Sequence, residues 1–320
     1  MLPIAVDAMG GDRAPGEIVA GARDAANSGL PVVLVGPQGL DTAGLDLIVA
    51  SEVIDMDEDP AGGVRRKKDS TLVRAAEAVR DGKASAMISA GNTGATMASA
   101  LLKMGRVSGV KRPAIATPIP VPGGRPTVLL DAGANAEVQA EWLVQFALMG
   151  SVYSHHRYGV ERPRVGLLSI GEEPGKGDTL RKDAYDLLKD AHGIDFIGNV
   201  EGRDVMTDDV DVVVTDGFTG NVVLKTLEGG MKTLVRALIA AFGSKDEYKP
   251  HADALFPALL PLYDSVDPDS TGGAALLGVD GVCIISHGSS SARAMVNGIK
   301  VAADMVESDM VGHLRRAINP

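Results

Sequence analysis

Short apolar runs alternate along the chain with longer segments whose apolar positions recur at helical spacing. Eight such runs predict strands, at 3–9, 31–36, 45–55, 84–90, 126–133, 164–171, 210–217 and 282–288. Amphipathic patterns predict helices at 16–28, 70–82, 94–105, 137–156, 179–191, 221–242 and 291–306. This alternation is typical of βαβ units, so we expect a three-layer αβα fold whose mostly parallel sheet carries helices on both faces.

One proline-rich segment, 111–127, breaks this alternation. Proline disfavours helix, and we interpret the segment as a crossover or an edge strand. No fixed-period repeat interrupts the rest of the chain. We therefore expect one domain over residues 1–320, arranged as two lobes around a cleft.

Composition narrows the class of protein. The 320 residues are 45% hydrophobic and have a formal net charge of −11. That charge argues against nucleic acid as a partner, because non-specific binding depends on neutralising phosphates. The single cysteine, Cys283, lies in an apolar run, which favours a buried hydrophobe over a nucleophile. No signal peptide or membrane-spanning stretch is evident, so we expect a cytoplasmic protein.

The loops after the predicted strands combine glycine with Asn, Ser, Thr or Asp, and several open directly into helices. Helix N-termini present free N–H groups, and glycine lets backbone approach a ligand closely, so these loops favour an anionic ligand. Dinucleotide, P-loop, nucleophile-elbow and H-E-x-x-H motifs are all absent, so we expect no cofactor and no metal. His155 and His156 end a helix-like segment, where they suit the negative end of the dipole.

Several of these loops form longer motifs. They are "VDAMGGD" (6–12), "RRKKDS" (65–70), "SAGNTGA" (89–95), "LLDAGAN" (129–135), "GNVEGRD" (198–204), "TDGFTGNVVLKTLEG" (215–229) and "HGSS" (287–290). Together they resemble the bacterial phosphate acyltransferases of phospholipid synthesis, over nearly the whole chain. The segment 244–267 resembles the family least.

This resemblance implies transfer of a long-chain fatty acyl group from acyl carrier protein to inorganic phosphate, giving acyl phosphate. A membrane glycerol-3-phosphate acyltransferase would then use that product for phosphatidic acid and phospholipid synthesis. The resemblance also implies a homodimer and a fold similar to the isocitrate/isopropylmalate dehydrogenase and phosphotransacetylase group. The H-x-x-x-x-D box of many glycerolipid acyltransferases is absent, which agrees with an acceptor that is already anionic.

The expected chemistry assigns roles to particular residues. Phosphate attacking a thioester gives an oxyanion that expels a thiol of pKa roughly 8.5, so no covalent nucleophile is required. The protein has to gather negative charge, orient phosphate and exclude water. We assign the leading catalytic role to Lys176, in the glycine-rich loop 169–178. Arg203 is a further catalytic cation, and Asp216 orients the cations or accepts a proton from phosphate. The predicted phosphate- or substrate-binding residues are Asn92, Thr93, Asp131, Asn135, Asn221, Lys225, His287 and Ser289.

Each assignment has a structural alternative. Lys176 is otherwise a solvated surface lysine. Arg203 and Lys225 are otherwise ion-pair partners of Asp204 and Glu228. Helix capping accounts for Asn92 and the other small polar residues nearly as well.

Two basic clusters are candidates for binding the strongly acidic carrier protein. One comprises Lys103, Arg106, Lys111 and Arg112, in a stretch without any acid, and the other is 65–68. We favour the first because it follows the helix of the "SAGNTGA" motif.

The segment 231–263 carries two apolar groups and serves dimer or membrane contact. The first group is a helical face of Met231, Leu234, Val235, Leu238, Ile239 and Phe242. The second comprises Leu255, Phe256, Leu259, Leu260, Leu262 and Tyr263. Core or dimer burial is the usual role of such faces. A surface hairpin in peripheral contact with the inner face of the cell membrane is the other.

Three other readings remain open. A phosphotransacetylase acting on acyl-coenzyme A shares the chemistry and the fold. A metal-dependent decarboxylating dehydrogenase would need a carboxylate cluster and a nucleotide site, and neither is found in the sequence. A non-catalytic lipid- or carrier-binding module is disfavoured by the polar loops at the strand ends.

Overall fold

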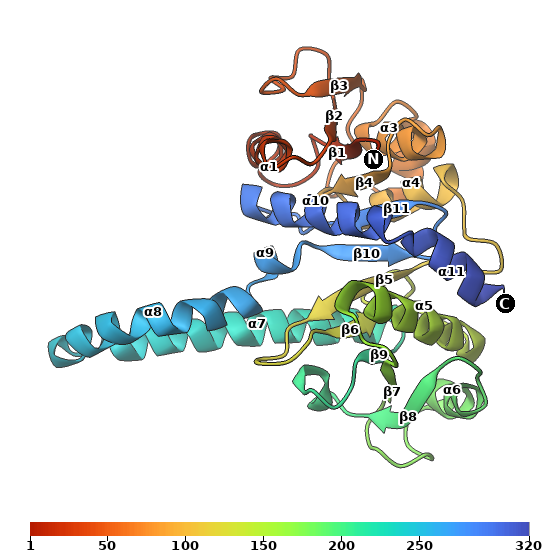
Figure 1. Cartoon of the computed structure of the whole chain (residues 1–320), viewed down its shortest axis with the longest axis vertical. Coiled ribbons are helices and arrows are strands. Elements are labelled where there is room, and N and C mark those ends of the chain that lie inside the picture. The colour runs from red at the N-terminus through yellow and green to blue at the C-terminus, as the bar shows by residue number, and fades with distance from the viewer. Residues whose placement is uncertain (320) are drawn as a thin grey trace.

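A computed structural model describes residues 1–319, except for the side chains at 262, 265, 266 and 268. In this part of the chain eleven strands form one sheet, in the order β3-β2-β1-β4-β11-β10-β5-β6-β9-β7-β8 (Figure 1). The strands are β1 (Ile4–Asp7), β2 (Val32–Gly36), β3 (Asp46–Val49), β4 (Ala86–Ser89), β5 (Ala114–Ile119), β6 (Thr127–Leu130), β7 (Arg164–Leu168), β8 (Asp195–Val200), β9 (Val212–Val214), β10 (Ala274–Leu277) and β11 (Val282–Ile285).

The polarity of the sheet reverses across its centre. β1, β2, β3, β4 and β11 run parallel to one another, and β6, β7, β8 and β9 form a second parallel group. Antiparallel pairs β11–β10, β10–β5 and β5–β6 join the two groups, so the groups run in opposite directions. We call the edge where β1, β4 and β11 end the first edge, and the edge where β6, β7, β8 and β9 end the second edge. The loops after the strands therefore lie at two opposite edges.

The prediction for 111–127 was wrong, because β5 lies in the interior of the sheet. Only Ala114, Ile115 and Ala116 pair with β10, whereas Pro118 pairs with Val128 of β6 alone. The missing N–H of Pro118 therefore interrupts no bond to β10, and an interior strand tolerates the proline. The sequence analysis also missed β8 and β10. β8 contains Gly198 at a register shift, and β10 is a four-residue run directly after two glycines.

Helices cover both faces of the sheet, as the alternating pattern predicted. They are α1 (Gly16–Asn27), α2 (Pro60–Arg66), α3 (Thr71–Arg80), α4 (Thr93–Lys103), α5 (Ala140–Tyr158), α6 (Thr179–Lys189), α7 (Gly217–Phe242), α8 (Lys249–Val266), α9 (Pro268–Thr271), α10 (Ala292–Glu307) and α11 (Met310–Ile318), with short 3₁₀ turns at Asp204–Met206 and Asp246–Tyr248. The expected αβα fold is confirmed.

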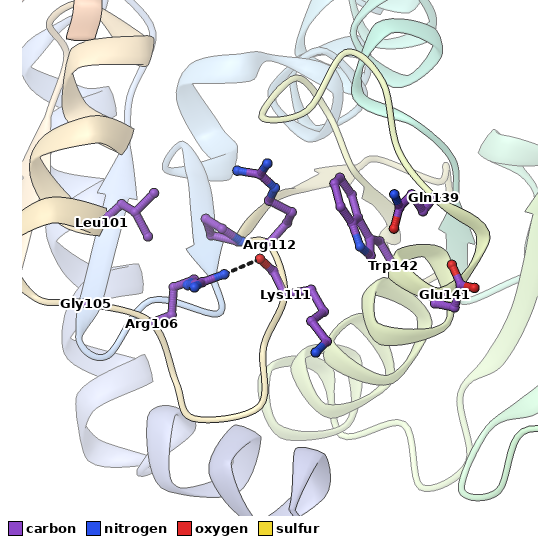
Figure 2. Close-up of a pocket in the computed structure, with 9 residues that line it drawn as sticks. Leu101, Gly105, Arg106, Lys111, Arg112, Gln139, Glu141 and Trp142 are labelled. Carbon is purple, nitrogen blue, oxygen red and sulfur yellow. Dashed lines mark hydrogen bonds between the residues drawn. The ribbon is translucent and has the colours of Figure 1, made fainter.

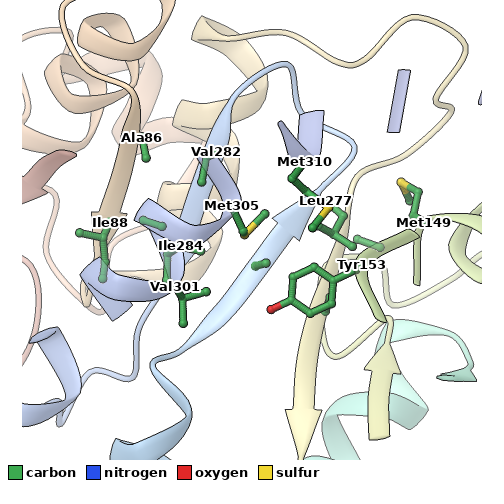
Figure 3. Packing of buried hydrophobic residues seen from close by; sticks show 14 of the residues in the cluster. Ala86, Ile88, Met149, Tyr153, Leu277, Val282, Ile284, Val301, Met305 and Met310 are labelled. Carbon is green, nitrogen blue, oxygen red and sulfur yellow. The ribbon is translucent and has the colours of Figure 1, made fainter. Parts of the chain in front are cut away.

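Alternate residues of each strand face different cores. Ile88 and Ile284 pack with Tyr153 of α5 and Val301 of α10 in a large cluster that also contains residues of α1, α6 and α11 (Figure 3). On the opposite face, Met87 and its neighbours pack with α2, α3 and α4, and the second half of the sheet packs with α7.

The helices α7 and α8 form a long antiparallel hairpin that projects from the rest of the molecule (Figure 1). α7 has 26 residues and is therefore about 39 Å long. Only its first turns contact the sheet, and the rest of the helix extends beyond it (Figure 1). Leu234, Ile239 and Leu255 are each more than half exposed, and Leu260 on α8 is 57% exposed. The side chain of Leu262 lies outside the described part. No helix within residues 1–319 combines the length and the hydropathy needed to cross a membrane.

Candidate active site

Three glycine-containing loops interlock at the first edge. The Asp12 N–H donates to the carbonyl of Gly288 at 2.8 Å, and the Ser89 hydroxyl donates to the Asp7 carboxylate at 2.7 Å. A Cβ at Gly10 would lie 2.7 Å from the Gly91 nitrogen, so this approach requires glycine. Burial raises the pKa of Asp7, although the bond from Ser89 opposes the shift. We call the combined surface of 7–12, 89–92 and 287–290 the glycine-loop cluster.

Asn92 uses its whole side chain to join the start of α4 to the segment 55–58. Its Oδ1 accepts from the Ala95 N–H at 3.0 Å and caps α4. Its Nδ2 donates to the carbonyls of Met56 and Glu58, each at 3.0 Å. Asn92 is also buried, so the structure favours the capping interpretation, while Thr93 beside it is exposed.

α7 brings charge to the exposed side of the cluster. The Lys225 ammonium pairs with Glu228 at 2.9 Å, as the structural alternative predicted. Burial and then the charge of Lys225 lower the pKa of His287, so the two side chains face a common region. The ring Nδ1 of His287 lies 2.8 Å from the Ser289 hydroxyl. His287, Ser289 and Lys225 are thus brought together.

The loop after β6, at the second edge, folds around Asp131. Its carboxylate accepts from the backbone N–H groups of Ile115 at 3.0 Å, Ala134 at 2.9 Å and Asn135 at 2.7 Å. Burial raises the pKa of Asp131 although these bonds stabilise its anion. The Asn135 amide donates both to Asp131 at 2.9 Å and to the carbonyl of Pro113 at 2.8 Å. Both side chains therefore shape the loop.

Asp216 caps α7 and holds a buried arginine that the sequence analysis missed. Its carboxylate accepts from the N–H and hydroxyl of Thr219, each at 2.8 Å, and pairs with Arg181 of α6. Burial alone would raise the pKa of Asp216, but these partners lower it, so the group stays ionised. Arg181 also contacts the Thr215 hydroxyl at 3.0 Å and Asp178 at 3.1 Å. The cap Asp178 three residues before Arg181 was the only sequence signal for it.

Lys176 and Arg203 also lie at the second edge and differ in their partners. Lys176 is exposed, and within the described residues no carboxylate pairs with its ammonium. Arg203 is exposed too but pairs with Glu172 at 3.0 Å, Glu201 at 2.6 Å and Asp204 at 3.8 Å. The predicted pair with Asp204 is confirmed, and the charge of Arg203 is largely compensated.

The predicted site residues therefore divide between the edges, because the sheet reverses its polarity. Asn92, Thr93, His287 and Ser289 lie at the first edge, and Asp131, Asn135, Lys176, Arg203 and Asp216 at the second. Asn221 and Lys225 connect the groups, since they are one turn apart on α7. Asn221 lies beside the loop after β6, as a Cβ at Gly133 would come within 3.8 Å of its side chain.

Three of the four favoured basic residues line a separate pocket. Arg106, Lys111 and Arg112 surround a cavity of about 870 Å³ between the end of α4 and the start of α5 (Figure 2). Lys103 lies outside it and pairs with Glu77 at 2.9 Å. In the other cluster, 65–68, two of the four cations pair with Glu58, at 3.1 and 2.6 Å.

The remaining chemistry-bearing groups are few. Cys283 is buried, as predicted, and burial raises its pKa to about 12, so it stays a thiol at neutral pH. Across residues 1–319, no three His, Cys, Asp or Glu side chains gather closely enough to hold a metal ion. His155 and His156 lie in the last turn of α5, as expected.

The fold is shared with phosphotransacetylases of known structure. A branched-chain phosphotransacylase from Enterococcus faecalis V583 superposes with a TM-score of 0.62 at 15% identity, over 96% of this chain and 99% of that one. A phosphotransacetylase from Streptococcus pyogenes gives 0.62 at 16% identity, over 96% and 94% of the two chains. The same fold occurs in a 4-hydroxythreonine-4-phosphate dehydrogenase from Klebsiella pneumoniae, with a TM-score of 0.55 at 14% identity over 96% of this chain and 100% of that one.

Sequence relatives define the family. A family model described as "Fatty acid synthesis protein" matches residues 2–313. The phosphate acyltransferase of Elusimicrobium minutum is 48% identical over 98% of this chain and 95% of its own length. That of an Exiguobacterium strain is 44% identical, over 99% of both chains. The chain belongs to the phosphate acyltransferase family and is an acyltransferase enzyme. The resemblance stated from its motifs is confirmed.

Proposed function

We propose that this enzyme transfers a long-chain fatty acyl group from acyl carrier protein to inorganic phosphate. The product, acyl phosphate, would feed a membrane glycerol-3-phosphate acyltransferase in the synthesis of phosphatidic acid. The observation that carries the proposal is family membership over nearly the whole chain, with relatives that are named phosphate acyltransferases. The glycine-loop cluster beside Lys225 and His287 supports it, because the cluster offers close backbone approach and positive charge to an oxyanion.

The reaction proceeds by direct attack in this proposal. A phosphate oxygen forms a bond to the thioester carbonyl carbon, and the carbonyl oxygen becomes an oxyanion. The C–S bond then breaks, the carbonyl reforms, and the thiolate leaves and takes a proton from water. The buried thiol of Cys283 supports this route, since a thiol with a pKa of about 12 makes a poor covalent nucleophile.

The roles of the cations follow from their surroundings. Lys176 lacks an ion-pair partner among the described residues, so its charge is available to phosphate or to the oxyanion. Arg203 keeps a secondary role because three carboxylates surround it. Asp216 acts as a positioning residue through Arg181 and is a poor proton acceptor, because its lowered pKa makes the carboxylate a weak base.

Thiol release from palmitoyl-acyl carrier protein, followed with and without phosphate, tests the proposal. We expect release to depend on phosphate and to yield acyl phosphate in equal amount. Lys176→Ala should lower kcat/KM about 100-fold, a loss typical of removing one group that stabilises an oxyanion. Its thermal midpoint should stay unchanged because the side chain is exposed. Phosphate-independent release would reject the proposal in favour of a thioesterase.

The second candidate function is that of a phosphotransacetylase acting on acyl-coenzyme A. The shared fold favours it, since the solved structures named above include phosphotransacetylases. Comparing kcat/KM for palmitoyl-coenzyme A and palmitoyl-acyl carrier protein separates the two. A higher kcat/KM for palmitoyl-coenzyme A would identify the coenzyme, in place of the carrier protein, as the acyl donor.

For the projecting hairpin we propose dimer or membrane contact, in a cytoplasmic enzyme that lies at the inner face of the cell membrane. Its exposed leucines and isoleucine support an apolar contact of either kind. Light scattering after size-exclusion chromatography and flotation with anionic liposomes distinguish them. The double variant Leu234→Glu with Leu255→Glu should abolish either dimer formation or liposome binding. If it abolishes neither, the hairpin has no part in these contacts.

A further inference from the structure

Contacts with neighbouring groups fix the side chains of Arg106 and Arg112 in the basic pocket past the end of α4. Arg112 stacks over the ring of Trp142, with its guanidinium carbon 5.0 Å from the ring centroid. The Arg106 guanidinium donates to the carbonyl of Lys111 (Figure 2). The Lys111 N–H in turn donates to Gln145 at 2.9 Å. These contacts hold two guanidinium groups in place before any ligand arrives, which reduces the entropic cost of binding.

The charge of the pocket points to an anion. Within residues 1–319, Arg106, Lys111 and Arg112 form no ion pair with a carboxylate, and Glu141 is the only acidic residue in the lining. The chain as a whole has a net charge of −11, so this local excess of cations is unlike the average surface.

The size and the apolar wall fit a ligand larger than a bare phosphate ion. The cavity of about 870 Å³ lies in the range of sites for whole small molecules. Leu101, Pro113 and Trp142 provide apolar contact next to the cations. A ligand that fits combines a phosphate group with an extended, largely uncharged arm.

The pocket also adjoins the residues predicted to bind substrate. Its wall residue Pro113 accepts a hydrogen bond from the Asn135 amide at 2.8 Å. The loop of Asn135 contacts Asn221, which is one turn from Lys225 on α7. The pocket therefore lies next to the loop that contacts α7.

We infer that this pocket binds the phosphate end of a phosphopantetheine arm, the thiol-bearing group shared by acyl carrier protein and coenzyme A. The inference rests on the proposed function, because it assigns a place to the thioester donor. Arg106 and Arg112 bind the phosphodiester, while Leu101 and Trp142 contact the arm.

Trp142 is the single tryptophan of the chain, so its fluorescence reports on the pocket directly. Coenzyme A and acyl carrier protein with its arm should change the emission saturably. Carrier protein without its arm and inorganic phosphate should not. Arg112→Gln and Arg106→Gln should each raise the dissociation constant about tenfold, equivalent to ~1.4 kcal/mol. Lys300→Gln, an equal change of charge on α10, should leave it unchanged.

Three results would overturn the inference. They are equal binding of carrier protein without its arm, saturation by phosphate alone, and a response that Arg112→Gln leaves intact. A response to coenzyme A but not to carrier protein with its arm would support the pocket and identify coenzyme A as the source of the arm. The thiol-release assay on the same variants separates the claims. If Arg112→Gln turns over with an unchanged KM for the acyl donor, the pocket is rejected but the proposed function stands. If the protein binds the arm but shows no phosphate-dependent turnover, the pocket stands and the proposed function is rejected.

Discussion

The two edges of the sheet carry loops of similar composition that do different work. At the second edge, Asp131, Asp216 and Arg181 are buried and satisfied by protein groups, and only Lys176 among the predicted site residues there is exposed without an ion-pair partner in the described chain. At the first edge, Lys225 is exposed, His287 is only partly buried, and both have few partners. Glycine, Asn and Asp after a strand therefore indicate only a turn or a helix cap. A ligand site is indicated where polar side chains keep donors or acceptors that no protein group uses.

The largest expected effect concerns the contact between α7 and the loop after β6. A Cβ at Gly220 would lie 1.9 Å from the carbonyl oxygen of Asp131, so Gly220→Ala should cost about 4 kcal/mol or more in the free energy of unfolding. Gly229 on the same helix faces open space, and Gly229→Ala should stabilise the protein by ~1 kcal/mol. Denaturant titration of both variants measures the difference, and equal midpoints would contradict the tight contact.

Removing the buried arginine should have the next largest effect. Arg181→Ala leaves Asp216 without its cation and should cost about 3 kcal/mol in the free energy of unfolding. Arg203→Ala should change stability by less than about 0.5 kcal/mol, because that side chain is exposed. A larger loss for Arg203 than for Arg181 would reverse our assignment of structural roles.

The first edge should respond in activity with little change in stability. Lys225→Ala should lower kcat/KM for phosphate about 30-fold, as expected for one cation facing an oxyanion, while the thermal midpoint stays within about 2 °C. Lys245→Ala, near the tip of the hairpin, is the matched control. Unchanged kinetics in Lys225→Ala would leave that lysine as a partner of Glu228 only.

The smallest expected effect is electrostatic. Burial and the charge of Lys225 lower the pKa of His287 below 6.5, so folding favours the neutral ring. Its contribution to stability is complete above pH 6.5 and is lost as the pH falls through the folded-state pKa. In Lys225→Met that pKa should rise, as read from the imidazole resonance in an NMR titration. An unchanged pKa would show that the charge of Lys225 on α7 does not act on His287.

The layers of the fold were predictable from local pattern, but the division of the site was not. Alternating apolar runs predict strands and helices because each element has to bury one face. The reversal through β10 and β5 depends on pairing between strands as distant as Ala275 and Ala116, and no local pattern contains that information. The capping role of Asn92 was stated from the sequence, but the bonds of its amide to Met56 and Glu58 were not, because they join segments more than 30 residues apart.

β10 and β5 also have a mechanical consequence. They join the two oppositely directed groups of strands by backbone hydrogen bonds, so no loose linker separates the halves of the molecule. A ligand that drew the halves together would have to twist this shared ladder of hydrogen bonds, and the sheet would resist that movement.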